Sequence, residues 1–296
     1  MAPMILSSWS CLAFARRAAC VSLLAAAACE RPADGGGAAL AGAGLPAAAL
    51  TTAPHDSLIP DGPLGVSIRR GRAILAATRD SMPEHVGNRL ACTNCHSDNG
   101  TRPNVMPWMG VYGQFPQYRS RVGGIQIIED RINDCFERSM NGKALPHASP
   151  ALRDMIAYLA FLSWGMPTGA RAEGQGLPPL QPLPGDTVRG AAIYLATCAR
   201  CHGVNGDGGI GPPVWGDGSY NIGAGMARLR TAAAFVRVAM PFDAPGTLTD
   251  QEAFDVAAYI NSRPRPDFPG KELDWPKGDP PPDVAYETRA AARKRP

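Results

Sequence analysis

The pattern of apolar and polar positions predicts two amphipathic helices in separate halves of the chain. In "SIRRGRAILAATRD" (67–80) and "RGAAIYLATCARCHG" (189–203), apolar side chains return every three or four positions with polar ones between them. That spacing is typical of a helix with one buried face, because an α-helix turns once in about 3.6 residues. In the second stretch, Ile193 and Tyr194 lie on the side that leads into "CARCH".

Start signals predict one further helix in each half. The first begins with Ser149 as N-cap and Pro150 in the first turn, and its apolar face is Leu152, Met155, Ile156 and Leu159. The second begins with Thr249 and Glu252, which have the spacing of a capping box, and continues as "AFDVAAYI". Each half therefore ends in an amphipathic helix.

The N-terminal residues predict export. Arg16 and Arg17 precede "AACVSLLAAAAC" (18–29), an apolar stretch too short to span a bilayer and typical of a signal peptide. We predict a signal peptide over 1–28, a periplasmic protein, and a flexible Ala/Gly/Pro tether over 29–60. Plain cleavage in the alanine run is the first interpretation. Cleavage before Cys29, which would leave a lipid anchor on that cysteine, is the alternative.

Composition changes this picture in two ways. The chain has 296 residues, enough for two domains, and its 33 glycines and 29 prolines predict long irregular segments. Its net charge of +3 is too small to indicate a nucleic-acid partner, and it has no basic run with interleaved aromatic residues. We therefore expect no binding to nucleic acid.

The cysteines predict two haem attachment sites. Of eight cysteines, Cys11, Cys20 and Cys29 fall in the export region, which leaves five. Four of these form "CTNCH" (92–96) and "CARCH" (198–202). In C-x-x-C-H, the two thiols bond to the haem vinyl groups and the histidine ligates the iron. The residues of this prediction are Cys92, Cys95 and His96 for the first haem, and Cys198, Cys201 and His202 for the second.

Other uses of these cysteines fit less well. A zinc ribbon places its two cysteine pairs about 15–20 residues apart, whereas these pairs are more than a hundred residues apart. A thioredoxin-type site or two disulfides would leave His96 and His202 unexplained. We therefore expect two covalently bound c-type haems.

The order helix, C-x-x-C-H, loops and terminal helix occurs twice and resembles the class I cytochrome c fold. The Pro/Gly-rich stretch 168–186 reads as the linker between the two copies. We predict an all-α protein with cytochrome c domains over 61–167 and 187–263 and an extended C-terminal tail over 264–296. The last residues of that tail, from 287 on, are expected to fray.

The sixth ligand of each iron should come from between the motif and the terminal helix. In the second half, Met240 is followed by a proline and lies shortly before the terminal helix, so we favour it over Met226, which suits core packing. The first half leaves several candidates open, and these are Met106, Met109, Cys135, Met140 and His147.

Spacing and local pattern disagree about the first half. Met240 precedes Tyr259 by 19 positions and Met140 precedes Tyr158 by 18, whereas Cys135 precedes Tyr158 by 23. Internal homology alone therefore favours Met140 and an electron carrier with histidine and methionine ligands.

The local pattern favours Cys135 instead. The stretch 126–140 reads as a helix that ends at Asn141-Gly142, and on it Arg131, Cys135 and Ser139 share one face at spacings of four. A cation beside a thiol favours the thiolate. Further basic residues lie close by in the sequence, and these are Arg119, Arg121 and Lys143.

Four stretches resemble the dihaem thiosulfate dehydrogenases, which form tetrathionate. They are "CFERSMNG" (135–142), "GPPVWGDGSYNIGAGM" (211–226), "MPF" (240–242) and "RPRPDFPGKELDWPKGDPPPDVAY" (263–286). The resemblance implies that His96 and Cys135 are the axial ligands of the first haem, which is the active site. It further implies that Arg121, Arg131 and Ser139 line that site. Some family members exchange a lysine for the methionine of the second haem, but Ala239 stands before Met240 here, so a simple His202/Met240 haem is expected.

The chemistry implied by the resemblance suits these residues. Coupling two thiosulfate dianions requires fixed cations in a partly desolvated site. The reaction releases two electrons, which we expect to pass from the first haem through the second to an acceptor such as a small c-type cytochrome. Two alternatives stay open: a dihaem electron carrier without a substrate of its own, and the same site working as a tetrathionate reductase.

Overall fold

A computed structural model describes residues 52–293. The predicted signal peptide, Cys29 and the tether up to residue 51 lie outside the described residues. The first half contains η1 (Asp56–Leu58), α1 (Gly62–Ala76), α2 (Thr78–Ser81), η2 (Cys92–Asn94), α3 (Ser97–Gly100), η3 (Tyr112–Gln114), β1 (Gln117–Arg119), β2 (Gly124–Gln126), α4 (Ile128–Asp134), η4 (Cys135–Ser139) and α5 (Pro150–Leu162). The second half and tail contain α6 (Thr187–Ile193), η5 (Tyr194–Cys198), α7 (Ala199–His202), η6 (Gly225–Ala227), α8 (Leu229–Ala239), α9 (Asp250–Asn261), η7 (Lys271–Leu273) and α10 (Arg289–Ala292).

The predicted all-α class is confirmed. Within residues 52–293 the only strands are β1 and β2, a short antiparallel hairpin that pairs Gln117 with Gln126 and Arg119 with Gly124. None of the helices in this part of the chain is long and apolar enough to cross a bilayer.

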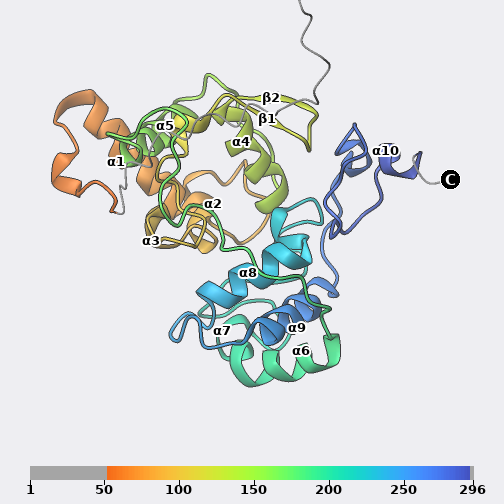
Figure 1. The fold of residues 1–296 in the computed structure, drawn as a ribbon. Helices are drawn as coiled ribbons and strands as arrows, with labels where there is room; N and C mark the ends of the chain where they lie inside the picture. Colours follow the sequence, from red (N-terminus) through yellow and green to blue (C-terminus); the bar gives the residue numbers. More distant parts are fainter. Residues whose placement is uncertain (1–51, 294–296) are drawn as a thin grey trace, which may run out of the picture. The chain divides into compact units, whose positions relative to one another are not determined.

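Each half is built on helices that pack on its terminal helix. Helix α1 packs on α5 in the first half, and α6 and α8 pack on α9 in the second (Figure 1). At both crossings a glycine permits the close approach. A Cβ on Gly71 would lie 1.9 Å from the backbone oxygen of Asp154, and one on Gly190 would lie 2.0 Å from that of Asp255. The same crossing therefore recurs in both halves, as the repeated order of elements predicts.

The predicted helix starts are confirmed. The Ser149 side chain accepts a hydrogen bond from the backbone N–H of Leu152 at 3.2 Å, with Pro150 as the first residue of α5. Thr249 and Glu252 cap each other's backbone N–H groups at the start of α9. These caps depend only on neighbouring residues, so the sequence is enough to predict them.

The described end of the predicted tether is ordered against the first helix. Arg72 of α1 donates a hydrogen bond to Asp56 at 2.5 Å, and Ile59 is buried in the core of the first half. The Ala/Gly bias of the preceding stretch ends before Pro54, so the residues that follow have side chains able to pack.

The helix expected over 126–140 is shorter and has two parts. Residues 124–126 pair in β2, so α4 begins at Ile128. From Cys135 to Ser139 the chain forms a π-helical turn, in which the N–H of Met140 bonds to the carbonyl of Cys135 at 2.8 Å. Single π-helical turns are rare and occur frequently at functional sites.

The C-terminal tail carries more structure than expected. Thr288 is 1% exposed and caps α10, and Arg289 pairs with Glu272 at 3.1 Å. The prediction that the chain frays from residue 287 is therefore wrong for residues 287–293, because a buried cap and an ion pair hold them.

Candidate active site

A cavity lies beside the first cysteine motif. It has an empty volume of about 580 Å³, part of it open to solvent. Most of its lining is apolar, and the lining residues that carry chemistry are Cys92, Cys95, His96, Cys135, Ser139 and Met140. Two thiols, an imidazole and apolar walls are what a covalently bound haem requires, so the residues present fit this cofactor.

His96 is prepared to ligate iron. Its Nδ1 lies 2.5 Å from the backbone oxygen of Met106. A carbonyl can only accept, so Nδ1 carries the hydrogen and Nε2 remains for a metal. Burial lowers the pKa of His96 to about 4, which keeps the ring neutral, and the ring of Trp108 lies 5.0 Å away. Because its carbonyl binds His96, Met106 belongs to the histidine side of the site and is a poor candidate for the sixth ligand.

The second motif repeats this arrangement. His202 Nδ1 lies 2.7 Å from the backbone oxygen of Pro212, which is ten positions further along, as Met106 is from His96. Met240 ends α8 and packs on the same buried cluster as Cys198. Met226 packs among core residues of three clusters, as its expected role in the core requires.

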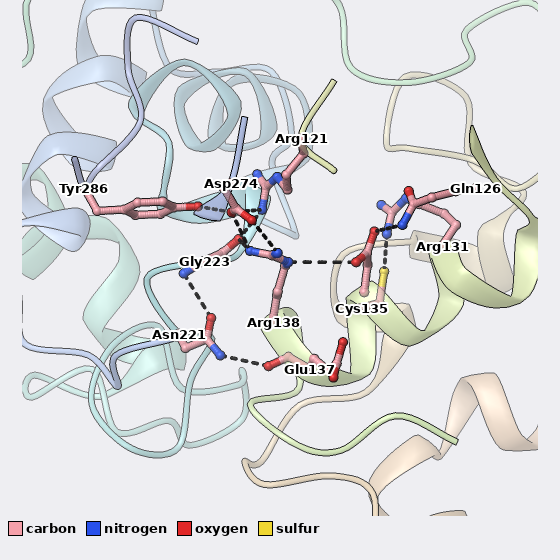
Figure 2. Close-up of polar contacts among 11 residues, drawn as sticks. Arg121, Gln126, Arg131, Cys135, Glu137, Arg138, Asn221, Gly223, Asp274 and Tyr286 are labelled. Atoms are coloured by element: carbon pink, nitrogen blue, oxygen red, sulfur yellow. Dashed lines mark hydrogen bonds and ion pairs between the residues drawn. The ribbon is translucent and has the colours of Figure 1, made fainter. Parts of the chain in front are cut away.

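Arg131 and Cys135 form the polar pair of the first site. The Nη1 of Arg131 donates to the Sγ of Cys135 at 2.8 Å (Figure 2). Attraction by the Cys135 sulfur raises the pKa of Arg131 despite its burial. The structure therefore brings together two of the predicted residues as a cation and a thiol. Ser139 joins them as a lining residue of the same cavity.

Arg121 lies elsewhere. It is absent from the cavity lining, and its Nη1 donates to the backbone oxygen of Gly223 at 2.5 Å. Its guanidinium lies 4.6 Å from the ring centre of Trp275 and 3.9 Å from Asp274. Arg121 lies there because a buried carboxylate and an aromatic face, both from the tail, attract its guanidinium group.

The other first-half candidates occupy different environments. Met140 is 3% exposed and packs in the core of the first half, although its side chain also lines the cavity. Met109 is 1% exposed. His147 is exposed and pairs with Asp130 at 3.1 Å, which places it on the surface rather than at the cavity.

No role was predicted for Arg138, Asp274 and Tyr286, which support the Cys135 turn from outside the cavity. Arg138 donates to both carboxylate oxygens of Asp274, at 2.8 and 2.9 Å, and Tyr286 donates to one of them at 2.5 Å (Figure 2). Burial raises the pKa of Tyr286, so its hydroxyl stays protonated as a donor. We call Arg121, Arg138, Asp274 and Tyr286 the tail cluster.

Comparisons with known proteins agree with this architecture. Residues 84–168 match the family model "SoxA/TsdA, cytochrome c domain", and residues 185–260 match "Cytochrome C oxidase, cbb3-type, subunit III". Both descriptions are of haem proteins with cytochrome c domains, and the two matches fall in the two halves described above.

Proteins that resemble most of this chain share the name thiosulfate dehydrogenase. The chain is 47% identical over 238 residues to the thiosulfate dehydrogenase of Allochromatium vinosum, covering 75% of this chain and 87% of that protein. It is 43% identical over 239 residues to the thiosulfate dehydrogenase of Psychrobacter arcticus, covering 78% and 73%. The solved structure of thiosulfate dehydrogenase (TsdBA) from Marichromatium purpuratum superposes with a TM-score of 0.71 at 39% identity. The match covers 74% of this chain and 50% of that chain.

Proposed function

Because the chain belongs to the thiosulfate dehydrogenase family and carries two covalently bound c-type haems, we propose that it couples two thiosulfate ions to tetrathionate at its first cysteine motif. The haems supply one-electron oxidation, and two of them match the two electrons that one tetrathionate releases. The observation that carries the proposal is the 2.8 Å contact between Arg131 and Cys135 at the wall of the first cavity.

We propose that Cys92 and Cys95 are the attachment points of the first haem and that His96 and Cys135 would ligate its iron. The neutral His96 ring and its bond to Met106 support the first ligand. The placement of Cys135 on the cavity, next to a cation, supports the second. A thiolate ligand lowers the potential of an iron relative to methionine.

Cys198, Cys201, His202 and Met240 would hold the second haem. The hydrogen bond from His202 to Pro212 and the packing of Met240 beside Cys198 support this assignment. Met240 as a ligand suits an electron-transfer site. We propose a small c-type cytochrome or a similar carrier as the acceptor.

The substrate is a small dianion, and the chain's own residues supply what it needs. Arg131 is the cation nearest to the sulfur of Cys135, and it balances both the thiolate and a neighbouring anion. The Ser139 hydroxyl lines the same cavity and makes no hydrogen bond within residues 52–293, so it is available as a donor to a thiosulfate oxygen. The mostly apolar lining lowers the local polarity, which strengthens both interactions. We propose that this chemistry takes place in the periplasm after export.

Two matched variants test the proposal. In the haem-loaded protein, Cys135→Gly should keep both haems and lose thiosulfate-dependent ferricyanide reduction by about a hundredfold or more. Met140→Leu conserves volume in the core and should keep most of the activity and the ferric spectrum.

The opposite result would favour an electron carrier with Met140 as ligand. In that case Cys135→Gly would be spectroscopically silent and Met140→Leu would change the haem spectrum. A tetrathionate-dependent oxidation assay with a reduced dye as electron donor, run beside the first, measures the reverse reaction.

A further inference from the structure

The backbone carbonyl groups at the end of the Cys135 turn require hydrogen-bond donors from outside the helix. The last carbonyl groups of a helix have no partner inside it, so they must be satisfied from elsewhere when buried. Two of them are satisfied locally. The carbonyl of Cys135 accepts from the N–H of Met140 at 2.8 Å, and that of Phe136 accepts from the N–H of Gly142 at 2.9 Å.

The next two carbonyls are satisfied by one residue of the other half. The Nδ2 of Asn221 donates to the oxygen of Glu137 at 2.8 Å (Figure 2), and the backbone N–H of Asn221 donates to the oxygen of Arg138 at 3.2 Å. Asn221 follows the second cysteine motif, so the second half supplies the cap of the helix that carries Cys135.

A second asparagine completes the cap. Asn88 donates through Nδ2 to the oxygen of Ser139 at 2.8 Å and to the oxygen of Ser219 at 2.9 Å. The carbonyl of Met140 accepts from the N–H of Gly87 at 2.9 Å. Every carbonyl from 135 to 140 thus has a donor, and the segment around residue 221 contributes to this network at more than one point.

The Asn221 side chain is held in one orientation. It is 1% exposed, and its Oδ1 accepts from the N–H of Gly223 at 3.0 Å. Its Nδ2 also lies 3.1 Å from the Oδ1 of Asn141, which follows the turn. With its oxygen occupied by a donor of its own segment, only the NH₂ group can face the turn.

We propose that Asn221 is a positioning residue for Cys135. It does not line the cavity, so it acts through the backbone of the turn rather than on the substrate. Two of its donors fix carbonyls two and three positions after Cys135, and this fixes the direction of the sulfur and its contact with Arg131. The inference rests on the proposed function, in which Cys135 acts at the first haem.

The same segment is also bonded to the second motif. The oxygen of Pro212 accepts from His202, and nine positions later Asn221 binds the Cys135 turn. A residue of the electron-transfer half therefore sets the geometry of the active-site half. A change at Asn221 should consequently alter the first haem more than the second.

The test compares Asn221→Asp and Asn221→Ala with Asn261→Asp in the haem-loaded protein. Asn221→Asp places a carboxylate oxygen against the Glu137 carbonyl, and Asn221→Ala removes the side-chain donor without adding charge. Asn261→Asp makes the same chemical change in the second half, where Asn261 donates to Met226.

We expect three results for the Asn221 variants. Deuterium exchange of the peptide spanning 135–142 should speed up by about tenfold or more, since a buried carbonyl loses its donor. The electron paramagnetic resonance signal of a thiolate-ligated ferric haem should broaden or shift. The kcat for thiosulfate should fall by about ten- to a hundredfold with little change in KM, because misplacement affects the reacting geometry. Asn261→Asp should change none of these by more than about twofold.

The outcomes separate the two proposals. If the wild-type protein shows neither a thiolate signal nor thiosulfate oxidation, the proposed function fails, while the exchange experiment still decides whether Asn221 holds the turn. If the wild type is active and the Asn221 variants match Asn261→Asp in exchange and resonance, the positioning role is refuted. If neither Asn221 variant matures with two haems, deuterium exchange of the wild-type protein tests the positioning role. Peptides 135–142 and 217–225 should then open with the same free energy, and unequal free energies of opening overturn the inference.

Discussion

Replacing Asp274 by asparagine should destabilise the tail cluster and the turn that carries Cys135. The carboxylate is 6% exposed and accepts two bonds from Arg138 and one from Tyr286, with Arg121 3.9 Å away. An asparagine of the same shape keeps one acceptor oxygen and loses the negative charge. The two guanidinium groups then face each other with Asp134, 3.9 Å from Arg138, as the remaining counter-ion.

The magnitude follows from burial. The side chains of Arg138 and Arg121 are 10% and 19% exposed, so solvent can compensate for little of the lost charge. Removing one partner of a buried pair costs about 3–5 kcal/mol. Repulsion already acts between the two cations: burial, followed by the neighbouring Arg138, lowers the pKa of Arg121 to about 10. We expect a loss of about 3 kcal/mol or more in the free energy of unfolding for Asp274→Asn.

Urea unfolding of the haem-loaded protein, followed by far-ultraviolet circular dichroism, measures this loss. Asp267→Asn is the matched control, because Asp267 lies in the same tail and pairs with Lys271 but its side chain is 70% exposed. An exposed pair is worth less than about 1 kcal/mol. If the two variants differ by less than about 1 kcal/mol, the tail cluster does not stabilise the fold.

Local chemistry made much of the fold predictable. The cysteine motifs, the capped starts of α5 and α9 and the apolar faces of the terminal helices all depend on residues a few positions apart. We did not predict α8, although its apolar positions recur at helical spacing, because four of its six buried residues are alanines rather than large apolar residues. It did not predict the hairpin β1–β2 either, since "QYRSRVGGIQ" has only three paired residues on each side.

The support of the site was not predictable, because it joins distant residues. Arg138 and Asp274 are 136 positions apart, and Asn221 and Glu137 are 84 apart. "CFERSMNG" and the tail both resemble the family, but nothing in either stretch shows that they touch. Arg121 illustrates the opposite case: its charge suits an anion site, but the structure gives it a partner in the tail.

Three further predictions follow from the site and the second half. Arg131→Gln should lower thiosulfate oxidation by about a hundredfold, because the cation that faces both the sulfur and the substrate is lost, and steady-state kinetics measures it. Met240→Leu should abolish the charge-transfer absorption band of a methionine-ligated ferric haem while haem content is unchanged. Although burial opposes it, hydrogen bonds led by that of Arg189 lower the pKa of Asp255. The contribution of the Asp255 carboxylate to stability should therefore be full above about pH 4 and be lost as the pH falls below that value. Urea midpoints measured across this pH range check the direction of the change. Asp255→Asn is the reference, because its midpoint should lack this pH dependence.

Spacing and local pattern disagree about the sixth ligand of the first iron because Met140 and Met240 lie in different surroundings. Met240 ends α8 with a half-buried side chain next to the second motif, whereas Met140 at the aligned position is 3% exposed in the core. Since the π-helical turn joins the N–H of Met140 to the carbonyl of Cys135, both side chains can line one cavity although they are five positions apart. Spacing thus identifies Met140, the methionine that corresponds in position to Met240 of the second half. Under our proposal the ligand is the cysteine at the other end of the same turn, where Arg131 lies 2.8 Å from the sulfur.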